Sequence, residues 1–179
     1  YTDSHWRQER ITKVADEIAA QMGAERIGTC EIQDTGRPFY GVYYGQAALP
    51  HAPERLFYLD NAVIRGLQVY NVETQSDIPV YDLGAAAGRD PYEMFLGGAR
   101  SIIKITNPNA AQERRLIVFR DSFGSSIAPL LAAGYSVITL VDIRYISPLS
   151  LGKLIDFTKA DDVLFLYSAS VINNSETIK

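Results

Sequence analysis

Residues 115–145 constrain the fold of this chain more than any other stretch. Two short apolar runs, 116–119 and 137–141, are rich in β-branched residues and have the length of buried strands. Between them apolar residues recur at helical spacing and Gly134 follows as a stop signal; these apolar residues are Ile127, Leu130 and Leu131. Strand, helix and strand in this order form a βαβ unit, which predicts an α/β fold.

The chain on either side extends this pattern. Apolar residues at helical spacing between residues 6 and 22, closed by Gly23, predict an N-terminal helix that carries Asp3 and His5 at its start. A helix from Ser147 and a third apolar run at 163–167 predict a βαβαβ end. Between these parts, strand-like runs occur at 27–32, 39–44, 55–59, 67–72 and 101–105.

Together these elements predict one domain spanning residues 1–179. We expect a flavodoxin-like, mainly parallel sheet with helices on both faces and a β-rich insertion at about residues 27–106. Within that insertion, the turn residues at 35–38 predict a hairpin between the first two strand-like runs.

Composition excludes several classes of function. The 179 residues are 47% hydrophobic and 21% charged, with a net charge of -4, which is ordinary for a globular domain. No dense Lys/Arg block is present, so nucleic acid is not an expected partner, and no apolar run has the length of a membrane span. Two histidines and one cysteine, Cys30, cannot form a disulfide or the usual Cys/His zinc site. We expect no metal and no cofactor.

The turn after the first strand of the βαβ unit contains Asp121 and Ser122. Ligands of open parallel sheets bind outside the carboxyl ends of the strands, so a serine here has its hydroxyl in the crevice. The N–H groups of the following helix turn can stabilise a negative oxygen. Ser122 is therefore a candidate nucleophile. An Asp-Ser pair before a helix is also an ordinary N-cap, and the turn alone leaves both interpretations open.

A serine nucleophile needs a base, and an acid that orients the base. The chain offers two imidazoles, His5 and His51. His51 lies near two prolines with no acid close by in sequence, whereas His5 follows Asp3 by two residues. In such a local pair the carboxylate can hold one ring nitrogen while the other faces the serine. The alternative is that Asp3 caps the N-terminal helix and His5 is a solvated residue of its first turn.

Further candidates follow the other strands. Arg144 comes after the second strand of the βαβ unit, where it could contact substrate or an oxyanion, or pair with a neighbouring aspartate. Tyr145 could stack on a sugar, although core tyrosines are commoner. Asn173 could supply an oxyanion-hole amide or belong to a plain turn. An aromatic group could form a sugar platform or only pack on the sheet; its members are Tyr40, Tyr43 and Tyr44.

Three short motifs carry a resemblance to a known family. Residues 2–6 read TDSHW, residues 120–124 read RDSFG and residues 142–145 read DIRY. They resemble the Asp-His-His-Trp, Arg-Asp-Ser-Phe and Asp-x-Arg-Tyr motifs of the bacterial DHHW family, with Ser4 standing where the first signature usually has histidine. This family is similar to the SGNH-like acyltransferases that acetylate alginate and other exopolysaccharides. In those proteins the Asp-x-His element precedes the serine, as it does here.

The resemblance implies an SGNH-like serine esterase or O-acetyltransferase, with Ser122 as nucleophile, His5 as base and Asp3 as the orienting acid. It implies an acyl-serine intermediate, an acetylated carbohydrate substrate of the cell envelope and work outside the cytoplasm, with a membrane-bound acyl-transfer partner. Family members are longer at the N-terminus, so we expect this chain to be the C-terminal part of a longer, exported or anchored protein. The alternatives are a non-catalytic carbohydrate-binding or scaffold component, and a nucleotide-binding domain. The turn at 120–124 lacks the glycine pattern that a nucleotide site needs.

Overall fold

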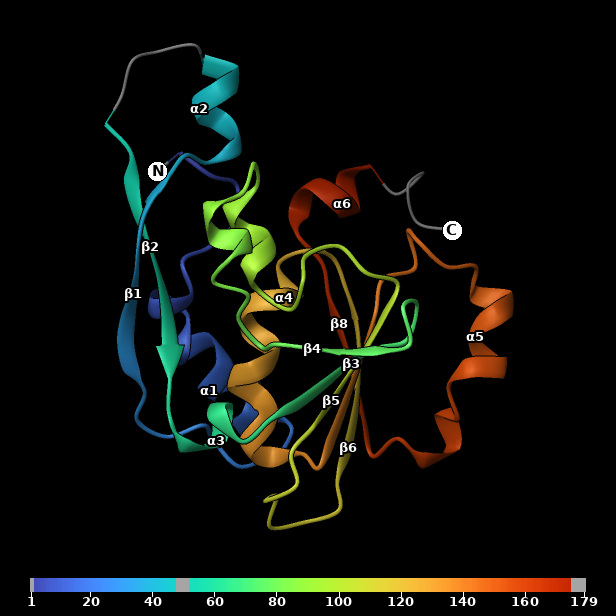
Figure 1. The fold of residues 1–179 in the computed structure, drawn as a ribbon. Coiled ribbons are helices and arrows are strands. Elements are labelled where there is room, and N and C mark those ends of the chain that lie inside the picture. Colours follow the sequence, from blue (N-terminus) through green and yellow to red (C-terminus); the bar gives the residue numbers. More distant parts are fainter. Residues whose placement is uncertain (1, 48–51, 175–179) are drawn as a thin grey trace.

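The structure is a computed structural model that describes residues 2–47 and 52–174, with only the backbone of Gly45 and Ala47 (Figure 1). It contains a six-stranded sheet with the strand order β4-β3-β5-β7-β6-β8 and a separate two-stranded ribbon. The six strands are β3 (Gln68–Asn71), β4 (Ser76–Ile78), β5 (Ile102–Thr106), β6 (Arg115–Arg120), β7 (Val137–Val141) and β8 (Asp162–Leu166). The ribbon consists of β1 (Glu31–Phe39) and β2 (Glu54–Asp60), which pair antiparallel.

The large sheet is mixed, so the prediction of a mainly parallel, flavodoxin-like sheet was wrong. Only β6 lies parallel to its neighbours, β7 and β8, while the pairs β5–β7, β3–β5 and β3–β4 are antiparallel. Parallel strands need a long crossover connection. The link at 107–114 between β5 and β6 is too short for one, so β5 enters the sheet in the opposite direction. The βαβαβ end supplies the parallel part, and the segment that we predicted as an insertion supplies the antiparallel strands.

Helices cover both faces of the sheet. On one face lie α1 (Thr12–Gln21), α3 (Ala62–Arg65), α4 (Gly124–Ile127) and the 3-10 helix η4 (Ala128–Gly134), and on the other lie α5 (Pro148–Leu154) and η5 (Phe157–Lys159) (Figure 1). The main core forms between the first group and the sheet, where apolar residues are almost fully buried, among them Ile103, Leu116, Leu130, Leu131, Ile138 and Leu140. The helix α6 (Ala169–Asn173) follows β8 at the carboxyl edge of the parallel strands.

The N-terminal part departs from its local sequence patterns. β1 continues through the predicted turn at 35–38, where Gly36 adopts a positive φ of 67° and the register shifts between Asp34 and Pro38. The predicted hairpin is therefore wrong, because β1 pairs with β2. Residues 42–44, predicted as the end of an aromatic strand at 39–44, instead begin the helix α2 (Val42–Ala47). The N-terminal helix α1 begins only at Thr12, after a 3-10 turn η1 (Gln8–Arg10), so Asp3 and His5 precede it in an irregular segment.

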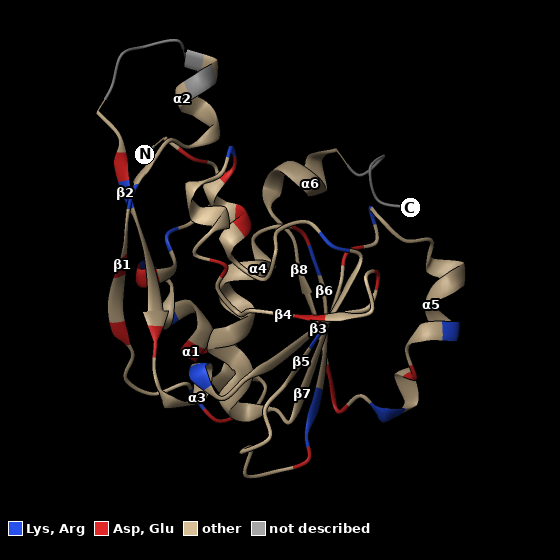
Figure 2. Ribbon diagram, in the orientation of Figure 1, with Lys and Arg blue, Asp and Glu red and all other residues tan. Residues whose placement is uncertain are grey.

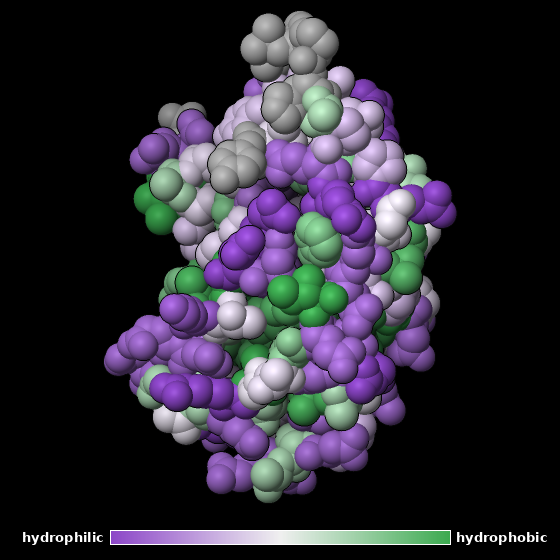
Figure 3. All heavy atoms as spheres, turned by 90° about the vertical axis from the view of Figure 1, so that its left-hand side faces the viewer, coloured by the Kyte–Doolittle hydropathy of each residue, from purple (hydrophilic) through white to green (hydrophobic). Residues whose placement is uncertain are grey.

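The surface gives no sign of one dominant charge. Side chains of both signs are spread over the elements (Figure 2). The face that carries the β1–β2 ribbon shows a small hydrophobic area surrounded by hydrophilic residues (Figure 3). Within residues 2–47 and 52–174, no helix has the length and apolar character that crossing a membrane requires.

Candidate active site

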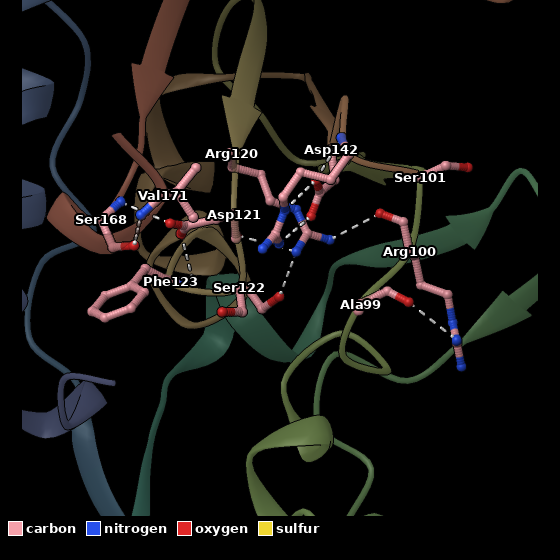
Figure 4. A network of polar contacts seen from close by, with 12 residues as sticks. Ala99, Arg100, Ser101, Arg120, Asp121, Ser122, Phe123, Asp142, Ser168 and Val171 are labelled. Carbon is pink, nitrogen blue, oxygen red and sulfur yellow. Dashed lines mark hydrogen bonds and ion pairs between the residues drawn. The ribbon is translucent and has the colours of Figure 1, made fainter. Parts of the chain in front are cut away.

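Ser122 lies in the tight turn between β6 and α4. The Asp121 carboxylate holds this turn, because its Oδ1 accepts the Phe123 N–H at 3.0 Å and its Oδ2 accepts the Ser168 N–H at 2.7 Å (Figure 4). Asp121 is almost fully buried. The N-cap position of α4 is Phe123, and no side chain caps this helix. Ser122 therefore does not act as the N-cap that we considered as its alternative role.

The Ser122 hydroxyl instead meets His5. The His5 Nε2 atom lies 2.7 Å from Ser122 Oγ, and His5 Nδ1 lies 2.6 Å from Asp3 Oδ1. The same Asp3 oxygen also accepts the backbone N–H of His5 at 2.8 Å, which closes a local turn. Residues 117 positions apart in sequence thus form a continuous hydrogen-bonded line of carboxylate, imidazole and hydroxyl. His51, the other imidazole, lies outside the described residues.

The start of α2 anchors Asp3. Its Oδ2 atom accepts the Val42 N–H at 2.9 Å, while Thr2 accepts the N–H groups of Gly41 and Tyr43 at 3.2 and 2.9 Å. These bonds supply the acceptors that the first N–H groups of a helix lack, and they explain why residues 42–47 form a helix. Burial acts to raise the pKa of the Asp3 carboxyl, but the hydrogen bonds from His5 and Val42 outweigh it and leave the pKa below its usual value. Asp3 is therefore held as a carboxylate.

Aromatic rings hold the plane of the His5 imidazole. Tyr92, in the 3-10 helix η3 (Pro91–Met94), stacks on it with ring centroids 3.9 Å apart and an interplanar angle of 12°. Phe123 contacts it at 5.0 Å with tilted rings. The side chains of His5 and Asp3 are only 12% and 8% exposed. Solvent therefore reaches this pair poorly, which strengthens the polar contacts between them.

Ser126 joins these parts and was not anticipated from the sequence. It is fully buried, and its Oγ accepts hydrogen bonds from Trp6 Nε1 and from the Tyr92 hydroxyl, both at 2.7 Å. Its own hydroxyl donates to the Phe123 carbonyl at 3.3 Å. Burial raises the pKa of Tyr92, so that this hydroxyl stays protonated and can donate. The Ser126 hydroxyl thus links Trp6, which follows His5, with Tyr92, which stacks on His5. It also links both to Phe123, which follows Ser122.

Gln8 adds a second buried link that the sequence did not reveal. Its side-chain amide donates to the Ser126 carbonyl at 2.7 Å and to the Tyr81 hydroxyl at 3.0 Å, and its carbonyl oxygen accepts the Leu59 N–H at 2.7 Å. Gln8 therefore ties the N-terminal segment to both α4 and β2. The only signal in sequence was a polar residue inside an apolar periodic stretch, which is too common to single out.

A buried arginine supports the nucleophile turn from below. Arg120 has no exposed surface, and its Nη1 donates to the Asp121 carbonyl and to Ser125 Oγ, both at 3.2 Å, while Nη2 donates to the Arg100 carbonyl at 3.4 Å (Figure 4). Burial lowers the pKa of Arg120, with Asp142 acting in the opposite direction. At Gly124 any Cβ would lie 2.6 Å from Arg120 Cβ, so glycine is required for this side chain to pass under α4.

The remaining candidates lie at the same edge of the sheet but make other contacts. Arg144 donates from Nε and Nη2 to the two oxygens of buried Asp142, at 2.9 and 2.6 Å, which is the ion-pair alternative for this residue. Tyr145 is 54% exposed and lies under the Arg144 guanidinium, and Asn173 is exposed on α6. Among the described residues, no hydrogen bond joins these three to Ser122 or His5. Their roles toward a substrate remain predictions, as do those of Asp3, His5 and Ser122.

The part of the chain that the structure describes contains no group of three or more His, Cys, Asp or Glu side chains arranged to hold a metal ion. Tyr40 and Tyr44 contact each other with ring centroids 4.7 Å apart, at the junction of β1 and α2. Tyr43 is exposed. The tyrosines of this region therefore do not all pack on the sheet.

No family model matches the chain, and no curated protein matches it at a significant level. Solved structures do. The chain superposes on a DHHW family protein from Eubacterium siraeum with a TM-score of 0.72 and 22% identity, covering 99% of this chain and 61% of that one. It superposes on Bacillus cereus PatB1 with a TM-score of 0.70 and 22% identity, covering 96% and 62% of the two chains.

A second structure of PatB1, which carries a sulfonyl adduct, gives a TM-score of 0.70 at 21% identity over 95% of this chain and 60% of that one. The chain thus spans about three fifths of the length of each of these neighbours. It shares their α/β fold, with a mixed sheet in place of the predicted mainly parallel one.

Proposed function

We propose that this chain belongs to the DHHW family and carries the catalytic centre of an SGNH-like serine esterase or O-acetyltransferase. The observation that carries the proposal is the line from Asp3 through His5 to Ser122, with hydrogen-bond distances of 2.6 and 2.7 Å. A carboxylate, an imidazole and a hydroxyl in this arrangement are what acyl transfer through a serine requires.

The reaction has two steps. In the first, His5 Nε2 accepts the Ser122 proton while Ser122 Oγ attacks the acetyl carbonyl, and His5 then returns the proton to the departing alcohol oxygen. In the second, water or a sugar hydroxyl attacks the acyl-serine by the same route, which releases the acetyl group and restores the hydroxyl. Asp3 accepts the Nδ1–H of His5 throughout, which fixes the tautomer and stabilises the imidazolium.

The backbone amide of Ser122 is the donor that we assign to the developing oxyanion. The Phe123 and Gly124 N–H groups are already bound to Asp121, whereas no acceptor for the Ser122 N–H is present among the described residues. A single amide gives part of an oxyanion hole.

The substrate class rests on the motifs and on the shared fold. The three motifs resemble those of a family similar to exopolysaccharide acyltransferases, and the fold is shared with a DHHW family protein and with PatB1. We therefore propose an acetylated carbohydrate of the cell envelope as substrate, an extracytoplasmic site of action and a membrane-bound acyl-transfer partner. One of the PatB1 structures carries a sulfonyl adduct, and sulfonyl reagents attach to activated nucleophiles.

The test combines covalent labelling with turnover. Wild-type protein should react with a fluorophosphonate probe and hydrolyse an aryl acetate, whereas Ser122→Ala should do neither. His5→Ala should lose nearly as much, because the members of a triad act as a unit. Ser150→Ala, which changes an exposed serine of α5, is the matched control. A folded wild-type protein that neither labels nor turns over would contradict the proposal and favour the non-catalytic, carbohydrate-binding alternative, and so would a Ser122→Ala variant as active as wild type.

A further inference from the structure

Asp3 also lines a groove whose lining residues do not include Ser122. The groove lies between α2 and the segment that carries η3, and it has a volume of about 710 Å³. A neighbouring hollow of about 300 Å³ is lined by two of the same residues, Tyr40 and Arg89, so the two hollows lie side by side. In Figure 1, α2 projects at the top of the molecule, above the green segment that contains η3. The groove is large enough for sugar units of a chain, since ligand pockets have typical volumes of 300–1,000 Å³.

The walls combine aromatic rings with polar groups. Tyr40 is 44% exposed and contacts Tyr44, so that part of a tyrosine surface faces the groove. Opposite them, Arg89, Asp90 and Glu93 supply a guanidinium and two carboxylates. A pyranose ring has C–H groups on its faces and hydroxyls around its rim. Tyrosine suits the faces because it has an apolar body and a polar tip, and the charged groups suit the hydroxyls.

The balance of charge selects the kind of sugar. Around the two hollows, the carboxylates of Asp90 and Glu93 are balanced by the guanidinium groups of Arg37 and Arg89, because the Asp3 carboxylate is already bonded to His5 and Val42. Asp90 and Glu93 line the hollow that also contains Asp3. A polyanionic chain of uronic acids would place like charges against them, which costs binding energy. A neutral sugar, including an N-acetylated amino sugar, meets no such repulsion.

The groove is joined to the proposed catalytic line at two points. Asp3 belongs to both, and η3 contributes Asp90 and Glu93 to the groove while its Tyr92 stacks on His5. A carbohydrate in the groove therefore lies beside the triad and not over the Ser122 hydroxyl. We propose that this groove is a flanking subsite, which holds neutral sugar units next to the one that is acetylated or deacetylated, with Tyr40 and Arg89 as its principal contacts. The inference rests on the proposed function for its place in the reaction.

Binding can be tested independently of catalysis. Calorimetric titrations would use fully N-acetylated chito-oligosaccharides and cello-oligosaccharides of increasing length as neutral probes, and oligoguluronates as the anionic probe. Wild-type protein should bind at least one neutral series more tightly than the anionic one. Tyr40→Ala and Arg89→Ala should each weaken that binding by about tenfold, the size of effect expected for one lost aromatic or charge-assisted contact. Tyr70→Ala, which removes a tyrosine of similar exposure from β3, should leave the affinity unchanged.

A kinetic ratio gives the second measurement. The ratio of kcat/KM for an O-acetylated neutral oligosaccharide to kcat/KM for an aryl acetate should fall about tenfold in Tyr40→Ala, mainly through KM. Absence of binding to every neutral probe, tighter binding of the oligoguluronate, or full affinity in both groove variants would each overturn the subsite. Failure of the proposed function would be seen separately, as the absence of fluorophosphonate labelling at Ser122.

Discussion

Gly41→Ala should disable the site from a residue that takes no part in the chemistry. Gly41 lies where the N-terminal segment crosses the start of α2, and a Cβ built on it would lie 2.5 Å from Asp3 Cβ and closer still to the Thr2 carbonyl. Ordinary van der Waals contact begins at 3.4 Å. The segment that carries Asp3 would therefore have to move by about 1 Å, and displacements of that size can cost about 100-fold in rate.

The same shift would strain the bonds that anchor the segment. The N–H groups of Gly41, Val42 and Tyr43 donate to Thr2 and Asp3 at 2.9–3.2 Å. Each such bond contributes about 1 kcal/mol, so losing two or three of them should lower the free energy of unfolding by about 2–3 kcal/mol. The expected result is thus a large loss of aryl acetate turnover in a protein that still folds.

Aryl acetate hydrolysis, fluorophosphonate labelling and urea unfolding together form the assay. Gly152→Ala is the matched control, because a Cβ there meets nothing within 4 Å and the residue lies inside α5. It should leave turnover unchanged and stabilise the protein by up to about 1 kcal/mol. If Gly41→Ala retained wild-type turnover and labelling, then the contact with α2 would not set the position of Asp3 and His5, and the account of the site would be wrong.

Three further substitutions test separate links. Asp3→Asn should reduce turnover less than Ser122→Ala, because it keeps the shape but weakens the hold on the imidazole. Since the folded-state pKa of Asp3 lies below its usual value of 3.8, the stability that its charge contributes is present above that pH and is lost below it. As the pH is lowered, urea titrations should therefore show a steeper loss in the free energy of unfolding for wild type than for Asp3→Asn. The same pH dependence in both proteins would show that the Asp3 charge makes no such contribution. Ser126→Ala should lower the free energy of unfolding by about 1–3 kcal/mol, since the part-buried Trp6 donor and the buried Tyr92 donor lose their acceptor. The same variant should also reduce turnover. If stability and turnover both kept their wild-type values, then Ser126 would not hold Trp6 and Tyr92 in place. Arg144→Ala should lower the free energy of unfolding by up to about 3 kcal/mol, because the buried Asp142 carboxylate loses two side-chain donors but keeps the N–H of residue 144 and the nearby charge of Arg120. A stable variant with impaired oligosaccharide turnover would instead assign Arg144 to the substrate.

The C-terminal half was predictable because its signals are local. The apolar runs that became β6, β7 and β8 are each bounded by turn residues, and the helical spacing between them is unambiguous. The direction of β5 was not predictable from its own residues, because it depends on the length of the link to β6 and on the choice of β7 as partner. The prediction of a mainly parallel sheet failed for that reason.

The N-terminal half was harder because distant residues override local preference. Residues 42–47 are rich in tyrosine, which favours strands, yet they form a helix whose first N–H groups bind Thr2 and Asp3. The order of the motifs suggested that Asp3, His5 and Ser122 form one site, and the structure places them within hydrogen-bond distance. Tyr92, Ser126 and Gln8 carry no local pattern that distinguishes them from core or turn residues, so only the fold reveals their contacts. Arg120 belongs to the RDSFG motif, but its burial beneath α4 was not predicted.

The backbone around His5 is irregular, so side-chain contacts must hold the largely buried imidazole in place. No helix or strand holds residues 2–7, and a segment of this kind is free to fluctuate unless side chains fix it. Four different elements do so: α2 binds Asp3, η3 stacks Tyr92 on His5, α4 binds Trp6 through Ser126, and β2 binds Gln8. Of these elements, β2 belongs to the ribbon, whereas α4 directly follows β6 of the large sheet. The position of His5 relative to Ser122 therefore depends on how the ribbon packs on the helices that lie between it and the sheet (Figure 1), so the geometry of the site is a property of the complete tertiary structure and not of any single motif.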